Sequence, residues 1–346
     1  MVPDRDRDFR RGSLLESPRV TPAQQSAASK RHHRHSRAFQ IGFALAIANT
    51  LIGATQPILT RYAAVRLDPI LFCAAVTTIA AVCALPFLYH RGELKILFDH
   101  RYLPWLIAMS MAGTVITTLT MIYGMQHIDA IATVILLQTE PVYSLILSVV
   151  VVGERPAPRQ LLATGAILAG IGSVFWAGNS FAPMFAAMLL FITPFFWQTS
   201  HVLGLRVMPP LTPIGVAGAR FIFAACVFIP MFLLRSNASL AQLRDPHLLV
   251  VILATGFFVY FISALTWYGA ISRLSLSWTT ALVVPGVPLI SMLFAMMFLG
   301  EHPTSHEVVG VLIAIVGVLA LVLGADPHRK AGGIVEAAEA IHQPIN

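Results

Sequence analysis

The sequence predicts an all-helical integral membrane protein, with ten transmembrane helices in two inverted five-helix repeats and both termini in the cytoplasm. Three observations lead to this prediction: scarce charge, ten long apolar segments and a repeated set of motifs. Of the 346 residues, 57% are apolar and 11% are charged, whereas ordinary soluble domains are about 25% charged. The 286 residues from Phe39 to Gly324 hold only 21 charged side chains. This composition excludes a soluble enzyme and is too apolar for a disordered chain.

Each predicted span is long enough to cross a bilayer, which takes about 20 mostly apolar residues. The first begins near residue 39 and is too long for the apolar part of a cleaved signal peptide. Asp68-Pro69, Thr212-Pro213 and Asp245-Pro246 each predict a helix N-cap followed by a proline in the first turn. Thr304 to Glu307 predicts a capping box. The ten segments are approximately 39–60, 69–90, 102–124, 130–152, 158–178, 182–205, 213–234, 247–269, 275–299 and 305–324.

Basic residues near the span ends predict the orientation. Thirteen Lys and Arg side chains fall on the side that holds both termini and four on the other, which places the termini in the cytoplasm. The predicted organisation is a disordered basic tail over 1–38, repeats over 39–178 and 181–324, and a cytoplasmic tail over 325–346. The first tail has nine basic and four acidic residues. We expect it to meet membrane lipids rather than nucleic acid, because the middle of the chain has no basic stripe.

The two halves of the sequence share motifs in the same order. Tyr123-Gly124 recurs 145 residues later as Tyr268-Gly269. Five further positions recur at a spacing of 147, namely Thr133, Pro141, Ser144, Gly153-Glu154 and Pro156, which match Thr280, Pro288, Ser291, Gly300-Glu301 and Pro303. Five spans per repeat is an odd number, so the second repeat would enter the membrane from the opposite side. Such inverted repeats are typical of secondary transporters, whose substrate sites lie near the membrane midplane.

The repeated block carries a resemblance to a known family. Residues 137–143 read Leu-Gln-Thr-Glu-Pro-Val-Tyr, and Gly153-Glu154 and a glycine-rich helix over 165–172 follow. Val287-Pro288, Gly300-Glu301 and residues 310–317 repeat the pattern. Over residues 39–324 the chain resembles the EamA family of the drug/metabolite transporter superfamily. The resemblance implies a permease or exporter of a small organic metabolite such as an amino acid, with proton or exchange coupling in some members. Family members often carry a Trp in the first helix of each half, whereas here Trp197 is matched by Ile52.

Glu140 is the first candidate site residue. It lies about ten residues into the fourth span, hence about 15 Å deep in the membrane. Thr133 and Ser144 share its helical face, and Thr280 and Ser291 occupy the matching positions of the ninth span. A carboxylate at this depth is costly and indicates a function. It could accept protons or bind a cationic group of the substrate, or it could be hydrogen-bonded for packing alone.

Arg220 is the second, about eight residues into the seventh span. Its depth permits pairing with Glu140, joint capture of a zwitterion, or fixation by backbone carbonyls. Prolines interrupt the first, fourth, sixth and ninth spans, and we expect these four to surround a central cavity. Gln56, Trp197, Gln198, Ser200 and His201 could line it, with helix packing as the alternative for Trp197 and His201.

Other features predict scaffold roles. Glu154 and Glu301 would anchor loops and place negative charge at the start of the next helix. Small residues of the fifth and tenth spans would allow close packing and could support a homodimer. We expect no cofactor, metal or enzymatic activity, since no HExxH, GxSxG or P-loop motif is present. The alternatives are an exchanger of the sugar or nucleotide-sugar type, an intramembrane enzyme, or a membrane adaptor.

Overall fold

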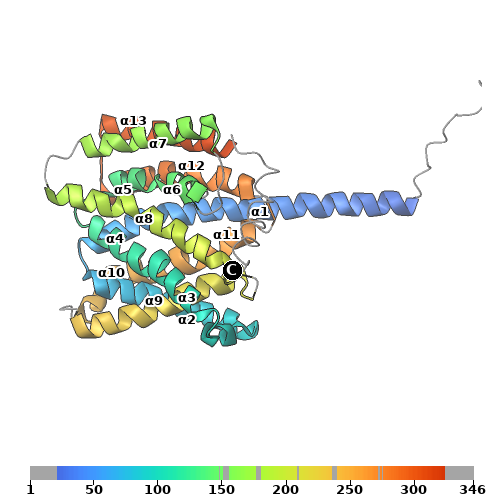
Figure 1. Cartoon of the computed structure of the whole chain (residues 1–346), viewed down its shortest axis with the longest axis horizontal. Coiled ribbons are helices and arrows are strands. Elements are labelled where there is room, and N and C mark those ends of the chain that lie inside the picture. Colours follow the sequence, from blue (N-terminus) through green and yellow to red (C-terminus); the bar gives the residue numbers. More distant parts are fainter. Residues whose placement is uncertain are drawn as a thin grey trace, which may run out of the picture.

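The computed structural model describes residues 22–147, 149–150, 156–176, 181–208, 210–235, 240–271, 273–274 and 276–323. Within these residues every regular element is a helix (Figure 1). The first repeat contains α1 (Pro22–Ala64), α2 (Pro69–His90), η1 (Glu93–Phe98), α3 (Leu103–Ser110), η2 (Met111–Ile116), α4 (Thr117–Gly124), α5 (Ala130–Leu137), α6 (Glu140–Leu147) and α7 (Pro158–Trp176). The second contains α8 (Phe181–Leu205), α9 (Pro213–Arg235), η4 (Leu240–Arg244), α10 (Pro246–Ala254), η5 (Thr255–Ile262), α11 (Ser263–Ile271), α12 (Leu276–Phe294), η6 (Ala295–Leu299) and α13 (Ser305–Leu323).

Seven helical segments within the described residues are long and apolar enough to cross a membrane. They correspond to the first four predicted spans and to the sixth, seventh and eighth. Two shorter apolar helices, Pro285–Leu299 and Ser305–Ala320, fall in the predicted ninth and tenth spans. The predicted fifth span is the helix α7. The sequence prediction of an all-helical membrane protein is confirmed at this level.

The helix starts follow the capping pattern read from the sequence. The Asp68 carboxylate accepts a hydrogen bond from the Leu71 N–H over 2.9 Å, and Asp245 accepts one from the His247 N–H over 2.9 Å. At α13 the Glu307 carboxylate accepts from the Thr304 N–H over 2.7 Å, which completes the predicted capping box. The helix α1 starts earlier than the predicted first span, at Pro22. Residues 22–38 are rich in Ala, Gln, Lys and Arg, which favour helix; residues 1–21 and 324–346 lie outside the described part.

The two repeats interlock through their first helices. The helix α1 packs against α11, η5, α10 and α12 of the second repeat, whereas α8 packs against α3, η2, α4, α5 and α6 of the first. Two further pairs join the repeats at the sides: α7 with α13, and α2 with α9 (Figure 1). Each repeat therefore completes its packing with helices of the other. Because α8 belongs to the second repeat, any contact it makes with a first-repeat helix connects the two repeats.

The pairing of α7 with α13 depends on small residues, as expected from the sequence. A Cβ atom on Gly317 would lie 2.8 Å from the Ala163 carbonyl oxygen, and one on Gly170 would lie 2.5 Å from the Gly310 carbonyl oxygen. Since those neighbours are backbone atoms, only glycine allows the two helices to approach this closely.

Two π-helical segments occupy equivalent places in the repeats. The segment η2 covers Met111–Ile116 in the predicted third span, and η5 covers Thr255–Ile262 in the predicted eighth. They begin 144 residues apart, close to the spacing of the sequence repeat. A π-helix offsets the backbone hydrogen bonds of its turn and is frequent at functional sites.

Candidate functional site

The predicted fourth span is interrupted at Gln138 and Thr139, where the sequence led us to expect one helix over 130–152. The helix α5 ends at Leu137 and α6 begins at Glu140. Pro141, which follows, has no N–H to donate and suits the first turn of a helix, so it favours a new helix start at this point. Gln138 and Thr139 are buried within the break, at 8% and 0% exposure.

Glu140 lies in the first turn of α6 and is half-buried. The Gln198 side chain on α8 donates from Nε2 to Glu140 Oε1 over 2.8 Å. Burial disfavours the charged carboxylate here, while a hydrogen bond from a neutral amide and the positive end of the α6 dipole act in the opposite direction. The contact also joins the two repeats, because α6 belongs to the first and α8 to the second.

Arg220 is held at the point where α8, α9 and η2 meet. Its Nη2 donates to the Gly113 carbonyl oxygen over 2.5 Å, and the Ser110 hydroxyl donates to the Arg220 carbonyl oxygen over 2.7 Å. The Ser200 hydroxyl donates to the Met109 carbonyl oxygen over 2.9 Å. This arrangement agrees with fixation by backbone carbonyls. Within the described residues, no ion pair joins Arg220 to Glu140.

Gly113 makes this junction possible. A Cβ atom at this position would lie 2.0 Å from Ser200 Oγ and 2.7 Å from Arg220 Nη2. Contacts that short do not occur between real atoms, so the helices can meet here only with glycine. The junction is thus closed by direct packing of α8 on η2.

The helix α8 connects the two candidate residues. Gln198 and His201 are three residues apart and so lie on the same helix face, about 4.5 Å apart along the axis. His201 is exposed, and the Arg220 guanidinium is near enough to act on it electrostatically. One side of α8 therefore borders a series of polar side chains. In order along the helix they are Glu140 of α6, Gln198 and His201 of α8 itself, and Arg220 of α9. Trp197, on the neighbouring face, packs against the main apolar core, which agrees with the packing alternative.

The remaining sequence candidates lie apart from this series. Thr133 is 0% exposed and donates to the Asp129 carbonyl oxygen of its own helix over 2.7 Å. Ser291 is also 0% exposed and donates to the Ala54 carbonyl oxygen over 3.0 Å, which ties α12 to α1. Gln56 directs Nε2 at the sulfur of Met121 over 3.7 Å. In the structure each of these three contacts its own helix or a neighbouring one. Ser144 is exposed on α6, and the side chain of Thr280 lies outside the described part.

Two buried amides were not singled out from the sequence. Gln138 Nε2 has no hydrogen-bond partner among the described residues. Asn49 is 6% exposed and donates to the Ser263 carbonyl over 2.8 Å and to the Thr266 hydroxyl over 3.1 Å, which joins α1 to α11. Both are polar amides inside otherwise apolar segments. That difference in polarity from their neighbours could have identified them in the sequence. An unsatisfied buried donor such as Gln138 calls for a water or a ligand.

Glu301 caps a helix, but not the one expected from the sequence. Its carboxylate accepts from the Ala130 N–H over 3.0 Å and from the Ile131 N–H over 3.2 Å, at the start of α5. We expected the Glu301 charge at the start of α13, but that helix is capped by Glu307, through the predicted capping box. Burial raises the pKa of Glu301, while the hydrogen bond from Ala130 opposes the shift. Glu154 lies outside the described residues.

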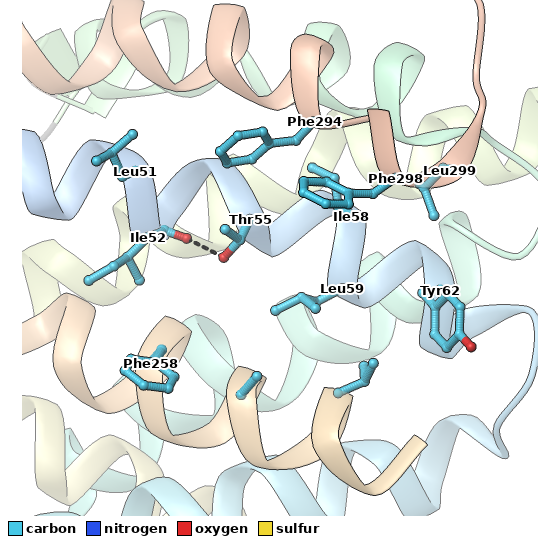
Figure 2. Close-up of a pocket in the computed structure, with 12 residues that line it drawn as sticks. Leu51, Ile52, Thr55, Ile58, Leu59, Tyr62, Phe258, Phe294, Phe298 and Leu299 are labelled. Carbon is cyan, nitrogen blue, oxygen red and sulfur yellow. Dashed lines mark hydrogen bonds between the residues drawn. The ribbon is translucent and has the colours of Figure 1, made fainter. Parts of the chain in front are cut away.

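A cavity of about 630 Å³ lies elsewhere, between α1, α10 with η5, and α12 with η6 (Figure 2). We expected the first, fourth, sixth and ninth spans around a cavity. This one is formed by the first, eighth and ninth, and its lining is almost wholly apolar. None of the candidate site residues lines it.

The comparisons with known proteins agree with this fold. The model of the EamA-like transporter family matches residues 40–176 and again residues 184–323. A search of curated proteins found no match. Solved structures do match, and one, described as "Crystal structure of protein", is 15% identical with a TM-score of 0.57 over 89% of this chain and 99% of its own. That likeness supports the fold alone. Because the family model covers both repeats, the chain belongs to the EamA-like transporter family, a group of multi-pass membrane transporters within the drug/metabolite transporter superfamily.

Proposed function

We propose that the protein is a secondary transporter, a permease or exporter, of a small zwitterionic metabolite such as an amino acid. It works by alternating access of two inverted five-helix repeats and couples transport to protons through Glu140. The observation that supports this most directly is the hydrogen bond from Gln198 to Glu140, which joins the repeats beside a broken helix. Broken helices near the membrane midplane are where transporters of this architecture bind substrate.

The Glu140–Gln198 contact can link protonation to movement. Rocking of one repeat against the other changes the distance between α6 and α8, so the 2.8 Å hydrogen bond holds in some orientations only. When it breaks, the carboxylate inside the membrane loses its donor and needs a proton or a cationic group in exchange. Protonation or an ammonium group on Glu140 would therefore favour the conformations in which α6 and α8 have separated.

The series along α8 suits a zwitterion. Glu140 would receive the ammonium group, while the positive charge of Arg220, beside His201, would attract the carboxylate. Gln138 offers an amide donor that is buried and has no partner among the described residues. A substrate with two opposite charges matches these groups better than a neutral sugar does.

The test is transport by purified protein in proteoliposomes, with a mixture of ¹⁴C-labelled amino acids as the probe. We expect saturable counterflow, and uptake driven by a pH gradient. The Glu140→Gln variant should lose the gradient-driven uptake, and its remaining counterflow should need a higher substrate concentration, because the carboxylate that receives the ammonium group is gone. Glu307→Gln is the matched control, because Glu307 is an exposed helix cap at α13. Full gradient-driven uptake by Glu140→Gln would contradict the coupling role.

A lack of amino acid counterflow by the unsubstituted protein would contradict the proposed substrate class. The same liposomes would then be loaded with sugars and nucleotide sugars, which tests the exchanger alternative. We further propose that the protein lies in the cell membrane with both termini in the cytoplasm, on the basis of its basic residues. A reporter enzyme that is active only outside the cytoplasm, fused after residue 346, should be inactive.

A further inference from the structure

The apolar cavity between α1, η5 and η6 opens sideways on the molecule and is here called the α1 groove. In Figure 2 its residues follow α1 from Leu51 and Ile52 at one end to Tyr62 and Leu299 at the other. Its single hydroxyl near the middle, on Thr55, donates to the Ile52 carbonyl oxygen over 2.6 Å. The groove is lined by Leu51, Ile52, Thr55, Ile58, Leu59, Tyr62, Val251, Ala254, Phe258, Phe294, Phe298 and Leu299.

The α1 groove has the length of one membrane leaflet. From Leu51 to Tyr62, α1 rises about 16 Å, which is half of a hydrocarbon core about 30 Å thick. These residues belong to the last part of the span Ala38–Ala64, while Val251 to Phe258 belong to the first part of the span Pro246–Trp267. All the helices therefore contribute the half that is nearest the same membrane surface.

The walls of the groove face the bilayer. Leu51, Phe258 and Phe298 are 45%, 51% and 67% exposed on the protein. An apolar cavity does not hold ordered water, since water there has no polar partners. In a membrane the space next to these side chains is filled with acyl chains. The groove is thus a channel along the protein surface that suits a single lipid tail.

A basic side chain lies near the Tyr62 end. Arg66 is exposed and stacks over the Tyr62 ring, with its guanidinium carbon 3.9 Å from the ring centre. Arg61 instead turns inward and donates to the Met125 carbonyl oxygen. Arg and Tyr at a helix end mark the membrane–water interface. The Arg66 guanidinium there can pair with the phosphate of a lipid headgroup above the tail, because guanidinium and phosphate form strong charge-assisted hydrogen bonds.

The equivalent place in the other repeat is closed. Thr55 and Phe258 correspond to Ser200 and Gly113 at a spacing of 145, and those two residues are packed directly against each other. The α1 groove is therefore not a general consequence of the repeat. Among the described residues it lies on the α1 side, where Phe258 of η5 stands at the position that Gly113 occupies in the first repeat.

We propose that the α1 groove binds one anionic phospholipid, with an acyl chain between α1, η5 and η6 and its phosphate at Arg66. The lipid comes from the leaflet at the Tyr62 end. Because α1 belongs to the first repeat and η5 and η6 to the second, the bound lipid contacts both repeats.

The test is native mass spectrometry of the full chain released from nanodiscs of equal parts phosphatidylglycerol and phosphatidylcholine. Ala254→Trp fills the groove, and Leu253→Trp is its control, because Leu253 is 47% exposed and does not line the groove. Arg66→Gln removes the headgroup charge. Arg206→Gln is its control, since Arg206 also stacks on an aromatic ring, that of Trp105, away from the groove.

We expect one phosphatidylglycerol retained by the unsubstituted protein and by both controls. Retention should fall roughly fivefold in Arg66→Gln, as for the loss of one basic side chain beside anionic lipid, and at least as much in Ala254→Trp. Ala254→Leu, a smaller filler, replaces Ala254→Trp if size-exclusion chromatography shows misfolding. If Ala254→Trp or Ala254→Leu retained as much phosphatidylglycerol as the control Leu253→Trp, the proposal would be overturned. Unchanged retention in Arg66→Gln would overturn the assignment of the phosphate to Arg66.

Discussion

The Gln198 amide donates to the Glu140 carboxylate over 2.8 Å, and this hydrogen bond connects α8 of the second repeat to α6 of the first. The sequence indicated that Glu140 was exceptional because of its depth, but gave no partner for it. The structure supplies a neutral partner rather than Arg220. A neutral partner lets the carboxylate gain and lose a proton without leaving an unpaired cation inside the membrane.

Removal of the Gln198 amide should impair transport. In Gln198→Leu, Glu140 loses its donor, and a hydrogen bond to a charged group is worth about 1.5–3 kcal/mol. Gradient-driven uptake in proteoliposomes should therefore fall by roughly tenfold or more. The matched control is Gln242→Leu, because Gln242 accepts a hydrogen bond from the Asp68 N–H in a connecting segment. Equal uptake in the two variants would contradict a role for the Glu140–Gln198 contact.

Gly113→Ala should destabilise the junction of α8 with η2. The new Cβ would lie 2.3 Å from Ser200 Cβ and 2.0 Å from Ser200 Oγ, and overpacking of this kind costs about 1–3 kcal/mol. We expect a lower melting temperature by tryptophan fluorescence in detergent. In a Ser200→Gly background the same substitution should cost less, because the two nearest atoms are gone and the next nearest, Arg220 Nη2, lies 2.7 Å away. An equal cost in both backgrounds would show that Ser200 is not the obstacle.

Gly317→Ala should weaken the pairing of α13 with α7. Its Cβ would meet the Ala163 carbonyl oxygen at 2.8 Å and the Ile167 nitrogen at 3.0 Å, and backbone atoms cannot move aside easily. The control is Gly165→Ala, where nothing lies within 4 Å. That variant should be neutral or more stable by up to about 1 kcal/mol, as alanine is the better helix former. A fall in melting temperature of similar size in both would contradict the close approach at Gly317.

Glu301→Gln should change how stability depends on pH. Burial raises the pKa of Glu301 above its ordinary value of 4.5, so the folded protein holds this proton more tightly than the unfolded chain. The associated stability is complete below pH 4.5 and is lost as the pH rises through the raised pKa. Glutamine stays neutral at every pH. As the pH rises from 4.5 through the raised pKa of Glu301, the variant should therefore gain stability relative to the original protein.

The measurement for Glu301→Gln is thermal unfolding at a series of pH values from 4 to 8 in matched buffers. Glu307→Gln reports the effect of losing an exposed helix-cap carboxylate and is subtracted. A difference between Glu301→Gln and the original protein that stays constant over this range would contradict the burial effect at Glu301.

Most of the architecture could be read from the sequence because it depends on local chemistry. Apolar length predicts spans in a bilayer, and the caps at Asp68, Asp245 and Thr304 formed as expected, since each involves residues two or three positions apart. Repeated motifs predicted two related halves, which the family comparison supports. The glycines of α7 and α13 also predicted close helix packing correctly.

Partners across the molecule were not predictable in the same way. A sequence does not say which distant backbone N–H groups a glutamate will meet, so Glu301 was assigned to α13 but caps α5. The break at Gln138 was missed for a similar reason, because Pro141 alone is compatible with either a kink or a new helix start.

The sequence by itself determined that this protein is helical, belongs in a membrane, is built from two repeats and carries rare ionisable groups at Glu140 and Arg220. Each of these properties depends on composition and on neighbours along the chain. Only the tertiary structure decided that Gln198 holds Glu140 and that the Gly113 carbonyl holds Arg220. Those contacts arise because the first helix of each repeat packs into the other repeat. This brings together residues more than 50 positions apart, whose distances no local pattern encodes.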